Sequence, residues 1–126
     1  MNGGRHLGIL LAASVLLPHA AISGEGAGGK VTVTGEVIDS ACYIKMGAKG
    51  ESHRECAQKC GDAGIPLALL EDKTGNVIWL ASVADMETPN AKLRPHAGRK
   101  VSVTGSYAER GGARILLVES VEAVKR

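Results

Sequence analysis

The chain has 126 residues, with 15 lysines and arginines against 13 aspartates and glutamates. A formal net charge of +2 gives no strong electrostatic attraction to nucleic acid or to an anionic membrane. One Trp, two Tyr and no Phe leave almost no surface on which the bases of a single strand could stack. We therefore expect no nucleic-acid partner.

The first 23 residues have the pattern of an export signal. A short basic start is followed by an apolar run over 7–17 and by small residues up to Ser23. The run is shorter than the ~20 residues of a stable transmembrane helix, so we predict cleavage after Ser23, with an uncleaved anchor as the alternative. The mature protein is then expected to be periplasmic or secreted, with no membrane anchor after signal cleavage.

After this signal, 24–29 is expected to be a flexible lead-in and 30–126 a single domain of ~100 residues. Five segments of this domain have the alternation or the short apolar run that is typical of strands. These segments are 30–39, 65–72, 77–82, 99–109 and 114–124. A polar connection over 84–98 is expected to hold a short helical turn before Pro95.

Two of the expected strands carry an internal glycine, Gly35 and Gly105. Such glycines suggest bulges or bends that curve a sheet. Five short strands with this curvature predict a mainly β fold, a small five-stranded OB-like barrel, with a β-sandwich as the alternative. Trp79, in the central hairpin, is expected to lie in the core.

Residues 43–64 lack a strand pattern and predict a helical insertion between the first two strands. Ser52 and Glu55 have the spacing of a capping box, which indicates a short helix over 53–60. On that helix His53, Cys56 and Cys60 would share one face, because residues three and four apart are neighbours. Cys42, at the expected end of the first strand, would approach this face.

The four residues Cys42, His53, Cys56 and Cys60 form a Cys₃His set, which suits zinc or Cu(I). A disulfide within the helix is disfavoured, since its Cβ atoms would be ~5–6 Å apart and a disulfide needs ~3.8 Å. A disulfide from Cys42 to one helical cysteine stays open as the alternative, and it leaves one thiol over. His53 is alternatively an exposed residue at the helix start, and Asp39 either orients a metal ligand or ends the strand.

Motifs for other cysteine chemistry are missing from the sequence. It contains neither C-x-x-C, which thiol-redox enzymes use, nor the C-x-x-C-H of c-type haem attachment. A binding protein is therefore favoured over an enzyme. The predicted function is handling or sensing of a thiophilic metal ion or metal cofactor. The alternative is a non-enzymatic interaction module, with an unknown protein partner and a structural disulfide.

Three motifs occur in order along the chain: G-x-V-x-D-x-x-C at 35–42, C-x₃-C at 56–60, and L-x-x-x-A-G-x-x-V-x-V-T-G at 93–105. In these motifs the chain resembles an uncharacterised family of small exported bacterial proteins that are OB-fold-like. The resemblance covers nearly the whole mature chain. It implies an OB-like fold and an exported location, and it implies no activity.

Overall fold

The computed structural model describes residues 28–125. The predicted signal peptide, 1–23, and the lead-in up to residue 27 lie outside the described residues. Among the residues that are described, no helix is long and apolar enough to cross a bilayer.

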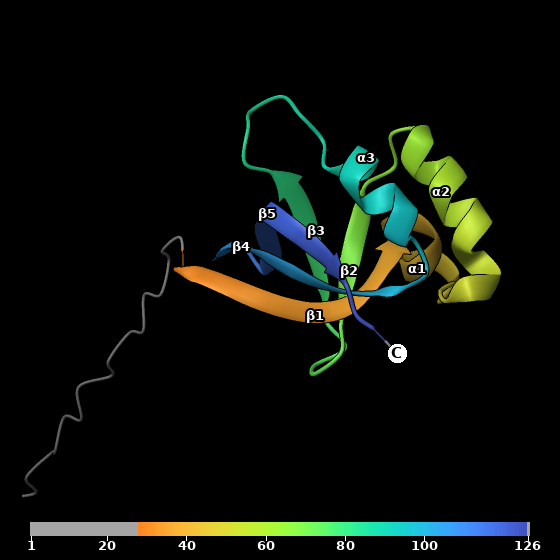
Figure 1. Cartoon of the computed structure of the whole chain (residues 1–126), viewed down its shortest axis with the longest axis horizontal. Coiled ribbons are helices and arrows are strands. Elements are labelled where there is room, and N and C mark those ends of the chain that lie inside the picture. The colour runs from red at the N-terminus through yellow and green to blue at the C-terminus, as the bar shows by residue number, and fades with distance from the viewer. Residues whose placement is uncertain (1–27, 126) are drawn as a thin grey trace, which may run out of the picture.

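Five strands close into a barrel in the order β1-β2-β3-β5-β4 (Figure 1). The strands are β1 (Lys30–Asp39), β2 (Leu67–Glu71), β3 (Val77–Ser82), β4 (Lys100–Arg110) and β5 (Ala113–Ala123). Neighbours are antiparallel except for β3 and β5, which are parallel. The predicted mainly β, OB-like barrel is therefore confirmed.

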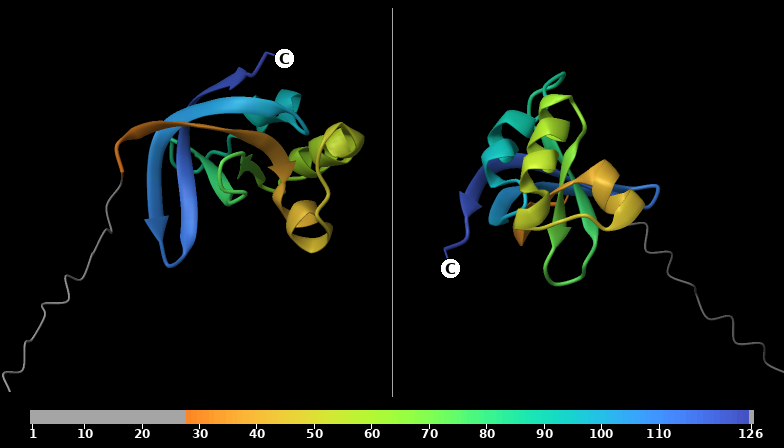
Figure 2. Two further views of the ribbon diagram at one scale, coloured as in Figure 1. Left: turned by 90° about the horizontal axis from the view of Figure 1, so that it is seen from below. Right: turned by 90° about the vertical axis from the view of Figure 1, so that its right-hand side faces the viewer.

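Helical segments leave the barrel at two points. Between β1 and β2 lie α1 (Ser40–Met46), the 3-10 turn η1 (Glu51–His53) and α2 (Arg54–Asp62). Between β3 and β4 lie α3 (Asn90–Leu93), which is the predicted helical turn before Pro95, and the 3-10 turn η2 (Arg94–His96), which contains Pro95. Figures 1 and 2 show these helices gathered at the end of the barrel where β1 finishes, away from the β4–β5 hairpin.

The two internal glycines act as the sequence indicates. β1 pairs with β4 along its first part and with β2 along its last part, and the two pairings overlap at Gly35 and Glu36. A Cβ atom at Gly35 would lie 2.3 Å from the carbonyl oxygen of Leu70, and one at Gly105 would lie 2.0 Å from that of Leu117. The register between β4 and β5 also shifts at Gly105, which marks a bulge.

Aliphatic side chains from all five strands fill the barrel. One from each strand is at most 2 % exposed: Val37, Leu69, Ile78, Val103 and Leu116. Burying a side chain of this size contributes about 1.5–3 kcal/mol. Leu93 of α3 is also fully buried and belongs to the same core, so the short helix is anchored to the barrel.

The prediction that Trp79 lies in the core is wrong. Side chains of β3 alternate, so Ile78 and Leu80 are buried while Trp79 is 38 % exposed. Trp79 instead lines an outer hollow of about 320 Å³ together with residues of the β4–β5 hairpin.

The insertion starts earlier than predicted, and Cys42 lies in α1 rather than at the end of the strand. The reason is Asp39, whose Oδ1 accepts hydrogen bonds from the backbone N–H groups of Ala41 (2.9 Å) and Cys42 (3.3 Å). A side-chain cap of this kind stabilises a helix by about 1 kcal/mol. The D-x-x-C motif is thus a helix start in this fold.

The predicted capping box does not form. Neither η1 nor α2 has a side-chain cap at its N-terminus, and Glu55 pairs instead with Lys59 at 2.8 Å. The 3-10 turn η1 runs directly into α2, so the helical backbone before α2 takes the place of a side-chain cap. The helix itself covers most of the predicted range 53–60 and continues to Asp62.

Candidate metal centre

Side chains from the end of β1, α1, η1 and α2 meet in two overlapping groups. The ligand atoms of Cys42, His53 and Cys56 lie within 4.8 Å of one another, and we call these residues the histidine triad. The ligand atoms of Asp39, Cys42 and Cys60 do so as well, and we call these the aspartate triad. Cys42 belongs to both, and all three cysteines are free thiols.

The aspartate triad is built on a carboxylate with no solvent exposure. Burial raises the pKa of Asp39, but hydrogen bonds from the thiols of Cys60 and Cys42 and from the backbone N–H groups at the start of α1 outweigh it and lower the pKa. Thiols are weak donors, and among residues 28–125 no group lies in ordinary hydrogen-bond geometry to Oδ2 of Asp39. The buried carboxylate therefore remains negatively charged beside two sulfur atoms.

This negative charge acts on both sulfurs. Hydrogen bonding to Asp39, burial and the charge of Asp39 raise the pKa of Cys42. The same causes, in the same order, raise the pKa of Cys60 to about 12. Both residues are consequently thiols rather than thiolates at neutral pH, so their sulfurs are poor nucleophiles there, and binding a metal ion would release their protons.

In the histidine triad, the ring nitrogen Nε2 of His53 is buried and has no hydrogen-bond partner among the described residues. Leaving such a group unpaired costs about 1–3 kcal/mol, and a metal ion is one ligand that would satisfy it. Cys56 is exposed, whereas Cys42 and His53 are half-buried, so the triad is open to solvent on the side of Cys56.

One face of α2 is tied to the segment 94–97. Arg54 donates to two backbone carbonyls of this segment, at 2.9 and 3.0 Å, and Gln58 donates to a third at 3.2 Å. Asp62 accepts from Nε of Arg94 at 2.7 Å. These three helical residues are four apart and form one stripe, so they fix the rotation of α2 about its axis.

Asn90 fixes the far end of α2. Its buried side chain accepts from the N–H of Leu67 (3.2 Å) and donates to the carbonyls of Gly61 (3.0 Å) and Ile65 (2.9 Å). One side chain therefore joins α2, the loop after it and the start of β2. No motif marks this residue, because an Asn in a polar connection is ordinary.

Of the four predicted ligands, the structure brings Cys42, His53 and Cys56 together. It places Cys60 in the other group, so the four do not form a single cluster at this spacing. Asp39 is the last residue of β1, as one of its two predicted roles requires, and its carboxylate also lies within 4.8 Å of the sulfurs of Cys42 and Cys60.

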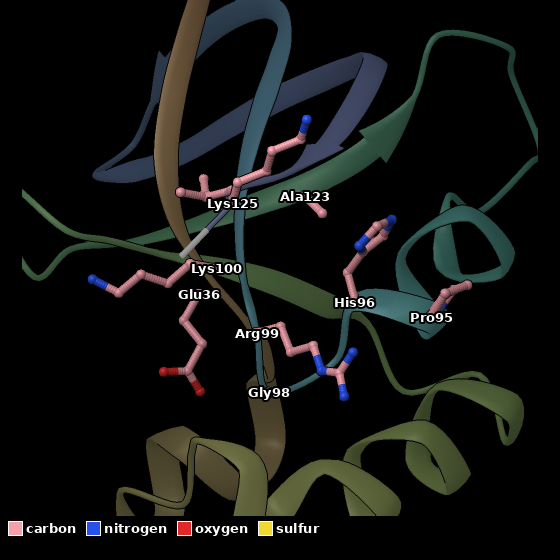
Figure 3. Close-up of a pocket in the computed structure, with 9 residues that line it drawn as sticks. Glu36, Pro95, His96, Gly98, Arg99, Lys100, Ala123 and Lys125 are labelled. Carbon is pink, nitrogen blue, oxygen red and sulfur yellow. The ribbon is translucent and has the colours of Figure 1, made fainter.

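A separate hollow of about 830 Å³ lies between η2, the start of β4 and the end of β5 (Figure 3). It is lined by Glu36, Pro95, His96, Gly98, Arg99, Lys100, Ala123, Val124 and Lys125. Two of its cations already pair with carboxylates, Arg99 with Glu51 at 3.3 Å and Lys100 with Asp72 at 3.0 Å. The hollow therefore lacks the concentrated positive charge of an anion site.

Comparison of the chain with protein families, with curated proteins and with solved structures gives no match. The candidate centre is accordingly defined by its own geometry.

Proposed function

We propose that this protein is exported and binds one thiophilic metal ion, zinc or Cu(I), through Cys42, His53 and Cys56. The observation that carries the proposal is the close approach of two thiol sulfurs and an imidazole nitrogen, within 4.8 Å of one another, at a His53 whose buried Nε2 has no hydrogen-bond partner among the described residues. The signal-like pattern over 1–23 and the resemblance to small exported proteins support the location.

The ligand types and spacing suit such an ion. Metal–sulfur bonds of ~2.3 Å at a tetrahedral centre place two sulfurs about 3.8 Å apart, so modest side-chain rotation would close the present spacing onto an ion. The three ligands come from α1, η1 and α2, so an ion would join both parts of the insertion. Three protein ligands also leave one position free, which fits a protein that receives an ion and passes it on.

We leave Cys60 out of this ligand set. Its sulfur is grouped with Asp39 and Cys42, and not with His53 and Cys56. Asp39 would instead act on the ion through its effect on Cys42, which it also holds in place by capping α1.

A second candidate function is an interaction module whose insertion is joined by a permanent disulfide from Cys42. The sulfurs of Cys56 and of Cys60 both lie within 4.8 Å of that of Cys42, which favours such a bond in an oxidising compartment. In that case the protein binds no ion, and one thiol stays free.

A competition titration with zinc distinguishes the two candidates. The reduced wild type is expected to bind one equivalent, and Cys56→Ser to bind at least ~100-fold more weakly, because a thiolate ligand is lost. Cys60→Ser is the matched control, one helical turn away, and is expected to retain affinity within about threefold. A wild-type protein that binds no zinc after reduction, or equal losses in both variants, would contradict the proposed ligand set.

A further inference from the structure

Cys42 occupies a position that two different arrangements require. It supplies one sulfur to the histidine triad and one to the aspartate triad. A sulfur that is joined to another sulfur in a disulfide is no longer a thiolate and no longer binds a metal as one. The two uses of Cys42 therefore exclude each other.

Cys60 is the better placed of the two possible disulfide partners. The sulfurs of Cys42 and Cys60 and a carboxylate oxygen of the buried Asp39 lie within 4.8 Å of one another. Their sulfurs lie within 4.8 Å, on helices that are separated by a loop, so side-chain rotation can join them without unwinding either helix. Cys56 is exposed and is grouped with His53 instead.

We infer that Cys42 and Cys60 form a reversible disulfide that competes with the metal ion for Cys42, so that oxidation releases the ion. The release step rests on the proposed function, whereas formation of the disulfide does not. In the oxidised protein the ion would keep only His53 and Cys56 of its three ligands.

The oxidant is an external disulfide, such as a small-molecule or protein disulfide. One of the two cysteines first loses its proton, which is a minor state at neutral pH because its pKa is raised, and then attacks the external disulfide as a thiolate. One external sulfur leaves and takes up a proton to become a thiol. The second cysteine then attacks the mixed disulfide, a sulfur–sulfur bond forms between Cys42 and Cys60, and the second external thiol leaves. Two electrons and two protons pass from the protein to the external disulfide, which becomes two thiols.

Glutathione disulfide is the probe for the test, applied to the reduced, metal-free protein at increasing ratios to glutathione. We expect the intact mass to fall by two hydrogens, about 2 Da, without a glutathione adduct. Trypsin separates the three cysteines, because cleavage after Lys30, Lys45, Arg54, Lys59 and Lys73 leaves them on peptides 31–45, 55–59 and 60–73. The expected cross-linked pair is 31–45 with 60–73.

Two variants sharpen this readout. Cys56→Ser is expected to form the same cross-link, and Cys60→Ser to form none that involves peptide 60–73, while its serine hydroxyl keeps a donor toward Asp39. A cross-link of 31–45 to 55–59 in the wild type, or glutathione adducts alone, would overturn the inference.

The release step is measured on the zinc-loaded protein with a colorimetric zinc chelator. Glutathione disulfide is expected to release about one equivalent of zinc from the wild type. Over the same time it is expected to release no zinc from Cys60→Ser. Retention of zinc by a fully cross-linked wild type would overturn the competition. If the reduced protein binds no zinc but the 31–45 to 60–73 link forms, the proposed function and the release step fail together, and the disulfide stands.

Discussion

Replacing Asn90 by alanine tests how the centre is held in place. The substitution removes three hydrogen bonds, of 3.2, 3.0 and 2.9 Å, and strands the N–H of Leu67 and two carbonyls in a buried position. At about 1 kcal/mol for each bond, with a larger cost where a buried group stays unpaired, we expect a loss of ~3 kcal/mol in the free energy of unfolding. For a domain of this size the melting temperature would fall by roughly 15 °C.

Urea denaturation followed by far-UV circular dichroism measures this loss, and fluorescence of Trp79 reports on the barrel in the same samples. Lys92→Ala is the matched control, since Lys92 is an exposed residue of the same short helix. Its free energy of unfolding is expected to stay within ~0.5 kcal/mol of the wild type. If Asn90→Ala unfolds as late as Lys92→Ala, the buried amide does not join α2 to the barrel as described.

Three further predictions concern the barrel and the thiols. Gly35→Ala is expected to destabilise the fold by about 2–3 kcal/mol in urea denaturation, because the alanine Cβ would overlap the carbonyl oxygen of Leu70. Gly29→Ala is the control and should be neutral, because nothing lies within 4 Å of its Cβ position. Equal stabilities of the two variants would refute the close approach of Gly35 to Leu70. In reduced, metal-free protein, iodoacetamide mass mapping should find Cys60 alkylated at least ~10-fold more slowly than the exposed Cys56 at pH 8, and a reversed order would contradict the contact with Asp39. The pKa of Cys60 is raised from 9.0 to about 12, so its contribution to stability is complete below pH 9 and is lost toward pH 12, because the unfolded chain ionises first. Urea denaturation at pH 8 and pH 10 should therefore show a smaller fall in the free energy of unfolding for Cys60→Ser than for the wild type. An identical fall in both proteins would count against the raised pKa.

Much of the barrel could be predicted from the sequence because its signals are local. Alternating valines and leucines define the strands, and Gly35 and Gly105 mark the points where two backbones approach. The outward position of Trp79 was missed because the phase of a six-residue strand decides it, and a large aromatic residue is compatible with either face.

The candidate centre was harder to predict because it depends on contacts between distant segments. The helical spacing predicted that His53 and Cys56 lie together, but it did not predict that Cys60 is grouped with Asp39 instead, or that Cys42 lies in a helix that Asp39 caps. Asn90 and Arg54, which hold α2 in place, make their contacts across 23 or more positions of the sequence. No local pattern encodes such contacts.

The most direct test of the central claim is X-ray absorption spectroscopy at the zinc edge of the reduced, zinc-loaded protein. Two sulfur ligands at ~2.3 Å and at least one imidazole nitrogen at ~2.0 Å are expected, from Cys42, Cys56 and His53. Loss of one of the two sulfurs in Cys56→Ser, with no change in Cys60→Ser, would complete the assignment. A spectrum with three sulfurs, or with oxygen and nitrogen ligands alone, would contradict it.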